Sequence, residues 1–278
     1  MKKTKIDWAD STWNPVTGCL HGCEYCYARG IANRFGSHLI TLAGKPTSPE
    51  ATKWKLHREM NHVLDNPMID TGKKMPYPFD FEPTLHRYKL GEPARWMKPR
   101  TIFVCSMADL FGDWVPDEWI KQVFEACKAA MQHRYLFLTK NPERIARLAS
   151  EDKLPNYNNF WFGTSVTTPE QPFYHEVPFF TNSNRSHSYG IFLSIEPIQE
   201  DFPVLDRLAR IPGKQQNGID WIIVGAETGN RKDKIYPSRE WIEHIAETSE
   251  KTGVPLFMKE SLRGLMGDDF KQEFPWEV

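Results

Sequence analysis

Six short apolar runs recur along the chain and limit its fold more than any other feature of the sequence. Each is rich in β-branched or aromatic residues, is bounded by turn signals and precedes a segment of helical or polar character, as in strands buried on both faces of a sheet. The runs are TIFVCSM (101–107), RYLFLTK (134–140), FWFGTSV (160–166), GIFLSIE (190–196), DWIIVGAE (220–227) and PLFMKES (255–261). Strands that alternate with helices form parallel sheets with right-handed crossovers, so the sequence predicts an α/β protein.

Helix-boundary signals stand between the runs. Pro116 suits the N1 position of a helix that continues to Met131, and Asn141 with Pro142 suits the N-cap and N1 of a second. Ser238 suits the N-cap of a third helix, and Gly253 is placed to end it.

Two further strands extend the series to eight: PTLHRY (83–88) and a strand just before Cys19. Eight strands and a length of 278 residues match one (β/α) barrel. We therefore predict a full or partial TIM-like (β/α) barrel with parallel strands and a cysteine loop after the first strand. A doubly wound open sheet is the alternative, because periodicity does not distinguish a closed sheet from an open one.

One stretch departs from this pattern. Residues 36–82 contain a predicted helix around Ala51–Leu64 and then a segment rich in Pro and Asp, NPMIDTGKKMPYPFDFEP. We interpret 1–278 as a single domain with an insertion at 36–82, which is a candidate lid or substrate-facing element. The stretch 167–189 is also polar and irregular.

The cysteines point to metal binding in a reducing compartment. The chain has five, an odd number, and three lie within eight residues, which makes a poor disulfide framework. The polar N-terminus, MKKTKIDWAD, lacks the apolar core of a signal peptide, and no run approaches the roughly 18 apolar residues of a membrane helix. The expected location is the cytoplasm, with no membrane partner.

The segment CLHGCEYC (19–26) allows two kinds of metal site, since thiolates select zinc, Cu(I) or iron–sulfur clusters. Cys19, His21, Cys23 and Cys26 supply the four ligands of a structural zinc site, although one-residue spacings on both sides of His21 strain such chelation. Three cysteines alone leave one iron of a [4Fe–4S] cluster open, because such clusters are normally held by four.

This segment resembles the CxxxCxxC signature of the radical S-adenosylmethionine (radical SAM) superfamily, including its aromatic residue, Tyr25. The resemblance implies that Cys19, Cys23 and Cys26 bind a [4Fe–4S] cluster whose open iron binds S-adenosylmethionine, with Tyr25 near the adenine. Reductive cleavage of S-adenosylmethionine then gives a 5′-deoxyadenosyl radical. An electron donor of the flavodoxin or ferredoxin type is an implied partner.

A wider set of segments resembles a bacteriophage- and prophage-associated, radical-SAM-like family with a three-cysteine motif and no assigned reaction. That similarity runs from about residue 5 to about residue 262 and rests on KIDWADSTWNPVTGC, CYAR, FVCSMADLF, LTKNP, SIEP and IVGAETG. The segment EYCYAR (24–29) resembles the cysteine loop of spore photoproduct lyase, a DNA-repair member of the superfamily. The superfamily's Gly-Gly-Glu motif has only a partial counterpart, Gly91-Glu92-Pro93, which equally suits the start of a helix.

Polar residues follow most of the apolar runs, where a (β/α) barrel carries its active site. Each has an equal interpretation as a helix cap or solvated loop residue. Glu196 and Glu227 are candidates for the amino group or ribose hydroxyls of S-adenosylmethionine, and Lys140 or Lys259 for its carboxylate or a substrate phosphate. The full set of cofactor-binding candidates is Tyr25, Ser106, Thr139, Lys140, Ser165, Ser194, Glu196, Glu227 and Lys259.

Three residues near these positions have other expected roles. Asp109 is expected to cap the turn before Gly112. Cys127 is expected in the core. Cys105 is also expected in the core, with a hydrogen-atom donor as its alternative role.

Charge bears on the substrate. The net charge is −1, yet residues 1–100 hold 16 Lys and Arg against 10 Asp and Glu, and they include four tryptophans able to stack bases. An ordinary solvated surface over packed tryptophans is the alternative explanation.

The sequence favours a radical SAM enzyme that modifies or repairs a nucleic acid or nucleotide. A non-catalytic zinc-binding interaction module and a radical SAM enzyme acting on a peptide or protein are the competing hypotheses.

Overall fold

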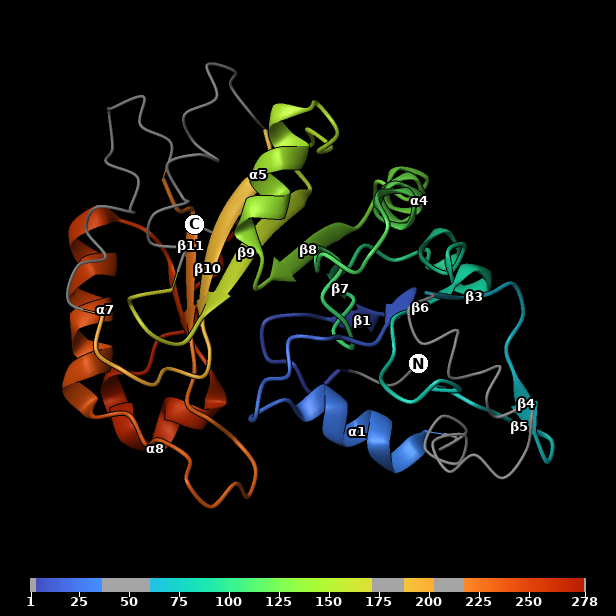
Figure 1. Cartoon of the computed structure of the whole chain (residues 1–278). Coiled ribbons are helices and arrows are strands. Elements are labelled where there is room, and N and C mark those ends of the chain that lie inside the picture. The colour runs from blue at the N-terminus through green and yellow to red at the C-terminus, as the bar shows by residue number, and fades with distance from the viewer. Residues whose placement is uncertain (1–3, 37–60, 172–187, 203–217, 278) are drawn as a thin grey trace. The chain divides into compact units, whose positions relative to one another are not determined.

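A computed structural model of the chain describes residues 4–36, 61–171, 188–202 and 218–277 (Figure 1). It forms two compact units. The strand unit comprises Met1–Ser11, Arg100–Ile102 and Arg134–Val278, and the cysteine unit comprises Thr12–Pro99 and Phe103–His133. Each unit is described by itself below.

In the part of the chain that the structure describes, the main sheet has seven strands in the order β1-β7-β8-β9-β10-β11-β12. Strand order rises along the chain without the reversal that marks a doubly wound sheet, so the fold is a partial (β/α) barrel, as predicted. Its strands are β1 (Ser11–Trp13), β7 (Thr101–Val104), β8 (Arg134–Thr139), β9 (Phe160–Val166), β10 (Gly190–Ile195), β11 (Trp221–Val224) and β12 (Leu256–Met258). All six predicted apolar runs form strands of this sheet.

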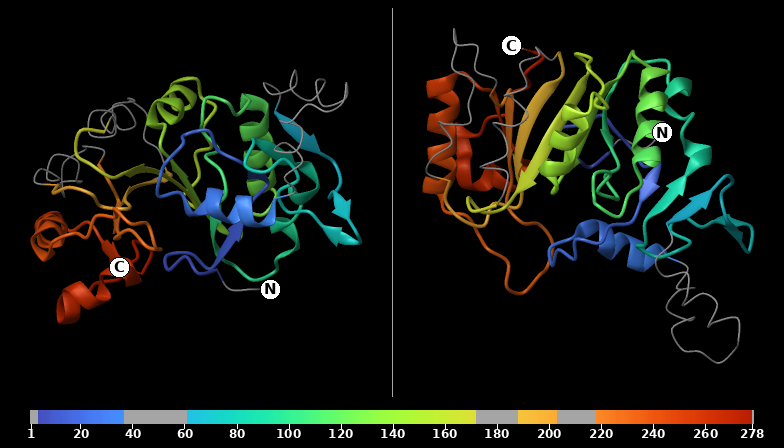
Figure 2. Two further views of the ribbon diagram at one scale, coloured as in Figure 1. Left: turned by 60° about the horizontal axis from the view of Figure 1, so that its bottom comes forward. Right: turned by 45° about the horizontal axis from the view of Figure 1, so that its top comes forward.

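In the strand unit, neighbouring strands from β8 to β12 pair in parallel. Helix α5 (Pro142–Ser150) follows β8, and α7 (Arg239–Thr252) precedes β12, beyond which lie η3 (Glu260–Leu262), α8 (Arg263–Met266) and η4 (Gly267–Asp269). Helices α7 and α8 lie beside the C-terminal strands (Figure 2). The predicted caps are confirmed: Asn141 is the N-cap of α5, and Ser238 and Gly253 bound α7.

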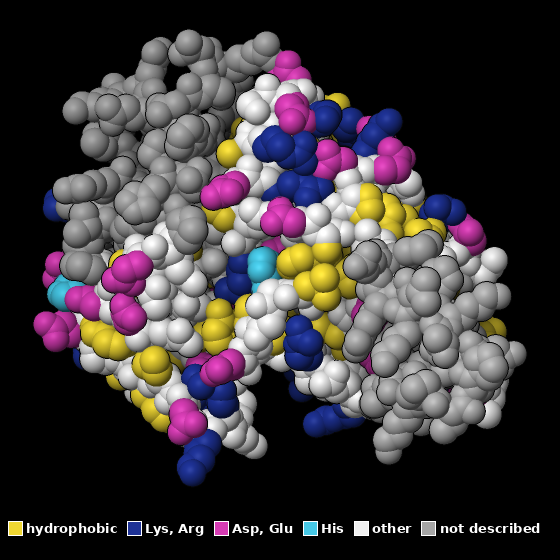
Figure 3. Space-filling model, in the orientation of Figure 1, with side chains coloured by type: hydrophobic (Ala, Val, Ile, Leu, Met, Phe, Trp, Pro, Cys, Tyr) yellow, Lys and Arg dark blue, Asp and Glu magenta, His cyan; other side chains and the backbone are white. Residues whose placement is uncertain are grey.

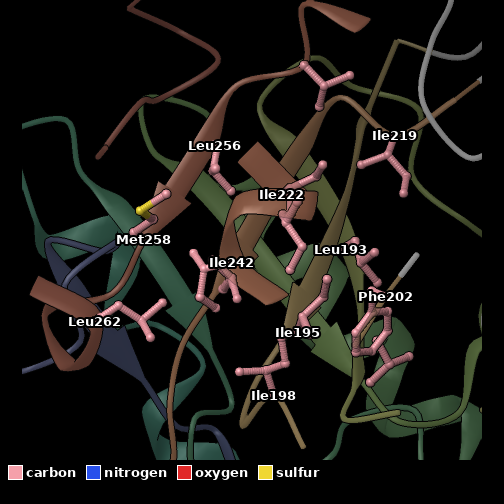
Figure 4. Packing of buried hydrophobic residues seen from close by; sticks show 14 of the residues in the cluster. Leu193, Ile195, Ile198, Phe202, Ile219, Ile222, Ile242, Leu256, Met258 and Leu262 are labelled. Carbon is pink, nitrogen blue, oxygen red and sulfur yellow. The ribbon is translucent and has the colours of Figure 1, made fainter. Parts of the chain in front are cut away.

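One face of β10, β11 and β12 supplies the core of this unit (Figure 4). Leu193, Ile222 and Leu256 pack there against Ile242 of α7 and Leu262 beyond β12, all with at most 1% of their surface exposed. Each such side chain contributes about 1.5–3 kcal/mol by leaving water. Because side chains alternate between the faces of a strand, the intervening residues face the other way.

The cysteine unit contains two small sheets. One has the order β2-β6-β3, formed by β2 (Val16–Thr17), β6 (Thr84–His86) and β3 (His62–Leu64), and the other pairs β4 (Ile69–Asp70) with β5 (Lys73–Lys74). Among the described residues of this unit, the helices are α1 (Tyr27–Phe35), η1 (Arg87–Lys89), η2 (Pro93–Arg95) and α4 (Asp117–Lys128).

Three predictions for this unit were wrong in part. PTLHRY was predicted as a strand of the barrel. It does form a strand, β6, but this strand belongs to the small sheet and pairs with β2 and β3. The predicted helix around Ala51–Leu64 ends instead in strand β3, and its first ten residues lie outside the described residues. Pro116 is the N-cap rather than N1 of α4, and Met131 lies beyond the end of that helix, with 41% of its surface exposed.

A buried histidine in β6 makes the stability of the cysteine unit depend on pH. His86 is fully buried; its Nε2 lies 2.8 Å from Thr17 Oγ1 and its Nδ1 lies 3.3 Å from the Tyr88 hydroxyl. Burial, together with the nearby charge of Lys89, lowers the pKa of His86 to about 3. The unfolded chain, with a histidine pKa near 6.5, therefore binds more protons than the folded chain between about pH 6.5 and pH 3.

We expect the free energy of unfolding to fall as the pH drops through that window, by about 2 kcal/mol from pH 7.5 to pH 5 on account of His86. Urea unfolding of the wild type and of His86→Gln at both pH values measures this contribution. The variant should be less stable at pH 7.5 but lose less stability on acidification. An equal loss in both proteins would show that another group carries the pH dependence.

Among the described residues, no helix is long and apolar enough to span a membrane.

Candidate functional site

The three clustered cysteines lie on the loop between β2 and α1. Cys19, Cys23 and Cys26 are each half-buried, and none forms a disulfide. Cys26 is the N-cap of α1: its Sγ accepts a hydrogen bond from the backbone N–H of Arg29 at 3.3 Å. The loop therefore ends in a fixed helix terminus, with all three thiols within one short segment.

Backbone contacts fix the start of this loop. The N–H of Gly18 donates to the carbonyl of Met107 at 2.9 Å, and the N–H of Cys19 donates to the carbonyl of Phe81 at 3.1 Å. Gly18 has a φ of +91°, and a Cβ at this position would lie 2.1 Å from the carbonyl oxygen of Glu82. Only glycine permits this close approach of the backbone to Glu82. The loop therefore requires a glycine at position 18, directly before its first cysteine.

Arg29 braces the loop from helix α1. Its guanidinium donates to the carbonyl of Cys19 at 3.1 Å and lies over the ring of Phe81, 5.1 Å from the ring centroid. One side chain thus connects the first cysteine to the helix that the third cysteine begins.

His21 and Asp109 form a pair that joins the loop to the segment after β7. His21 Nε2 lies 2.8 Å from Asp109 Oδ2, and the other carboxylate oxygen accepts the N–H of Phe111 at 3.0 Å. The side chain of Asp109 is 7% exposed, and the ring of His21 packs edge-on against Trp114 at 4.8 Å. The predicted turn-capping role of Asp109 is confirmed. Its pairing with His21, 88 residues away in sequence, was not predicted.

Ser106 also lies in the segment after β7, and it contacts both flanks of the loop. Its hydroxyl donates to Asn14 Oδ1 at 3.2 Å, and the N–H of Met107 donates to the same oxygen at 3.0 Å. The hydroxyl of Tyr27 donates to the carbonyl of Ser106 at 2.7 Å. Asn14 and Tyr27 thus connect the predicted site residue Ser106 to either side of the cysteine loop, where Tyr25 is half-buried.

The environments of the cysteines differ. Burial raises the pKa of Cys19 to about 12, opposed by the backbone N–H of His21 and reinforced by the charge of Asp109. Cys105 and Cys127 are buried in the core, as predicted, and burial raises the pKa of each thiol, to about 12 for Cys105. Cys105 is held at a φ of +59°, directly before Ser106.

The geometry of the cysteine loop bears on which metal group it fits. In the described part of the chain, no three His, Cys, Asp or Glu side chains are arranged to hold one metal ion. The loop does present three thiols that form no disulfide, and thiolates are the ligands of iron–sulfur clusters. Ligands of a cluster bind separate iron atoms and need not converge on one point, as the ligands of a single zinc ion must.

Several of the predicted strand-end residues of the strand unit gather on one face of the sheet. The register pairs Ser165 with Ser194, and Ser194 lies between Leu193 and Ile195, which face the core beside α7. Lys140 Nζ donates to Ser165 Oγ at 3.4 Å, and Ser165 Oγ donates to the carbonyl of Glu196 at 3.3 Å.

An ion pair extends this polar layer across the sheet. Lys259, after β12, pairs with the carboxylate of Glu196, after β10, and both side chains are less than one-third exposed. The stem of Lys259 crosses Gly225, where an added Cβ would meet its Cδ at 2.8 Å. We call Lys140, Ser165, Ser194, Glu196 and Lys259 the strand-end cluster.

Ser194 has an unusual environment within this cluster. Its hydroxyl is fully buried and has no hydrogen-bond partner among the described residues. A buried polar group without a protein partner is uncommon in folded proteins.

Two of the predicted residues lie apart from the strand-end cluster. Thr139 is buried, and its Oγ1 accepts the N–H of Asn141 at 2.9 Å, a local contact at the start of α5. Glu227 forms a two-point ion pair with Arg231 at 2.8 Å for each contact, which lowers the pKa of Glu227. Gly91-Glu92-Pro93 starts the short helix η2, the second of the two interpretations considered above.

The sequence matches the family described as "Protein of unknown function (DUF5131)" over residues 3–265. The chain belongs to this family. No curated protein matches its sequence.

Solved structures of spore photoproduct lyase share the fold of this chain. A mutant form gives a TM-score of 0.50 at 12% identity, covering 93% of this chain and 79% of that chain. The complex with dinucleoside spore photoproduct gives 0.52 at 13% identity, and a mutant with the same dinucleoside gives 0.51 at 12%; each covers 92% of this chain and 78% of that chain. At these identities the likeness is one of fold.

Proposed function

We propose that this protein is a radical SAM enzyme in which Cys19, Cys23 and Cys26 bind a [4Fe–4S] cluster. The observation that carries the proposal is the braced loop with three half-buried, unpaired thiols. The fold shared with spore photoproduct lyase, a radical SAM enzyme, supports it. We also propose that 1–278 is one barrel domain with an insertion at 36–82.

The chain's own residues prepare the loop for this role. Gly18 allows the close approach to Glu82, Arg29 holds the carbonyl of Cys19, and His21 is anchored by the buried carboxylate of Asp109. These contacts hold the loop backbone, so that little conformational entropy is lost when the thiols bind iron.

When bound, the cluster with S-adenosylmethionine on its open iron would supply the reductive cleavage that yields a 5′-deoxyadenosyl radical. For the polar groups of S-adenosylmethionine, our candidates in the strand unit, taken by itself, are the members of the strand-end cluster. Lys140 and Ser165 are suited to its carboxylate, Glu196 to its amino group or ribose hydroxyls, and Ser194 has an unsatisfied hydroxyl on the same face. Tyr25 and Ser106 remain our candidates on the cysteine unit. Thr139 and Glu227 are weaker candidates because each is engaged by a local contact.

We further propose a nucleic acid or nucleotide as substrate. Support comes from the spore photoproduct lyase structures that bind a dinucleoside, and from the excess of Lys and Arg in residues 1–100. We also propose that the protein is cytoplasmic and belongs to a group of phage-associated proteins. Its proposed electron donor is a flavodoxin- or ferredoxin-like protein.

One observation favours a second candidate, a zinc-binding interaction module. Histidine ligands of zinc commonly share their other ring nitrogen with a carboxylate, which is the arrangement of His21 and Asp109. In that case Cys19, His21, Cys23 and Cys26 would have to move together to hold one zinc ion, with His21 binding through Nδ1, because no three such side chains of the described residues are arranged around one point.

Anaerobic reconstitution separates the two candidates. We expect a brown protein with about four iron and four sulfide per chain, which forms 5′-deoxyadenosine from S-adenosylmethionine after reduction with dithionite. A colourless protein with one zinc per chain and no 5′-deoxyadenosine would reject the enzyme. Including a single-stranded oligonucleotide or a peptide mixture in the assay tests the substrate, since the radical takes a hydrogen atom from its substrate to form 5′-deoxyadenosine and the substrate is consumed.

A further inference from the structure

Helix α1 carries an exposed apolar stripe directly after the cysteine loop. Tyr27, Ile31 and Phe35 have 55%, 38% and 56% of their surfaces exposed. We call these three residues the α1 stripe. They are spaced four residues apart and therefore share one side of the helix, over about 12 Å of its axis.

Tyr27 attaches the start of α1 to the carbonyl of Ser106 through its hydroxyl, at 2.7 Å, while its exposed ring and the side chains of Ile31 and Phe35 lie outside the core that holds the helix. The helix packs into the cysteine unit through Ala28 and Ala32, with 6% and 0% exposed, which belong to a small core with Phe81 and Met107. Exposed aromatic and aliphatic side chains in a row are costly to leave in water, which makes the stripe a candidate contact surface.

Charge around the stripe favours an anionic occupant. The two charged residues of α1 are Arg29 and Arg34, and the helix has no acidic residue. Arg34 is exposed, three residues after Ile31 and seven after Tyr27, so it lies on the same side as the stripe. Two carboxylates also lie in this region: Glu24 stands three residues before Tyr27 in the cysteine loop, and Asp80 Oδ1 lies beside Gly36.

Aromatic side chains beside an arginine are typical of surfaces that bind single-stranded nucleic acids, where bases stack on rings and cations contact phosphates. We propose that the α1 stripe, with Arg34, binds unpaired bases of a single-stranded nucleic acid. This deepens the proposed function and rests on it for the class of substrate. On the face drawn in Figure 3, basic and acidic side chains are interspersed over the described residues.

Fluorescence anisotropy with a labelled, mixed-sequence 12-nucleotide DNA or RNA tests the proposal, with full-length protein and no S-adenosylmethionine. We expect Phe35→Ala to bind about tenfold more weakly than wild type, since one lost stacking contact corresponds to about one factor of ten or more. Arg34→Gln should bind more weakly at low salt, and the slope of log K against log salt should decrease by about 0.7.

Met131→Ala is the matched control, because Met131 is 41% exposed in the same unit and lies outside α1. It should bind like the wild type, and circular dichroism should show all variants folded. Equal affinities for wild type, Phe35→Ala and Ile31→Ala would overturn the proposal, as would failure of the wild type to bind either oligonucleotide. A variant that instead changes the oligomeric state in light scattering would identify the stripe as a contact between copies of this chain and would also overturn it.

This test is independent of the radical chemistry. Binding that depends on the stripe, in a protein that never forms 5′-deoxyadenosine, would reject the proposed enzyme and keep the nucleic-acid surface. Formation of 5′-deoxyadenosine by a protein whose stripe variants bind normally would keep the enzyme and reject this surface.

Discussion

Replacing Cys23 by Ala is expected to leave a folded protein that no longer assembles a cluster or forms 5′-deoxyadenosine. Cys23 is half-buried on the loop, so removing its sulfur creates no large cavity and the loop contacts of Gly18 and Arg29 persist. Losing even a residue that orients a ligand lowers metal affinity about 10–100-fold, so losing the ligand itself should cost more than about 100-fold. Iron and sulfide per chain and the yield of 5′-deoxyadenosine are the measurements.

Cys127→Ala provides the control for loss of a thiol. Cys127 lies in α4, outside the cysteine loop, and its side chain is fully buried in the core. This variant should keep its iron and its 5′-deoxyadenosine yield. If Cys23→Ala retained a brown chromophore with four iron per chain, Cys23 would not be a cluster ligand and the proposed site would fail.

The strands were predictable because local periodicity determines them. All six apolar runs form strands, and Asn141 and Ser238 occupy the N-cap positions of the helices assigned to them, since helix-boundary preferences and burial act over a few residues. Strand β6 shows the limit of this reasoning. Its residues predict a strand correctly, but the choice of partners depends on β2 and β3, far away in sequence.

The residues of the candidate site were predictable from the sequence to a similar extent: local features were found, and contacts between distant positions were not. The cysteines and the polar strand ends are visible in the sequence, whereas the pairing of His21 with Asp109 joins positions 88 residues apart. Thr139 and Lys140 adjoin in sequence, yet Thr139 is taken up by a local contact and Lys140 contacts Ser165. Within a strand, successive side chains point to opposite faces of the sheet. This alternation stops where the strand ends, so the sequence does not predict which way the side chains of the residues just beyond it point.

Gly18→Ala is expected to damage the cysteine loop although it removes no ligand. The added Cβ would lie 2.1 Å from the carbonyl oxygen of Glu82 and 2.7 Å from the nitrogen of Pro83, so backbone must move. It would also sit at a φ of +91°, which alanine rarely adopts. Overpacking costs about 1–3 kcal/mol and the backbone strain about 1 kcal/mol more. We therefore expect the free energy of unfolding to fall by about 2–4 kcal/mol.

Gly22→Ala separates the effect of the steric clash from that of the backbone strain. Gly22 lies in the same loop at a φ of +74°, but no atom lies within 4 Å of a Cβ added there. This variant should lose only about 1 kcal/mol and keep its iron. Gly18→Ala should bind substantially less iron, since displacement at Glu82 breaks the contact of Gly18 with Met107 and moves Cys19. Urea unfolding and iron content measure both effects. Equal behaviour of the two variants would mean that the approach of Gly18 to Glu82 does not position the first cysteine.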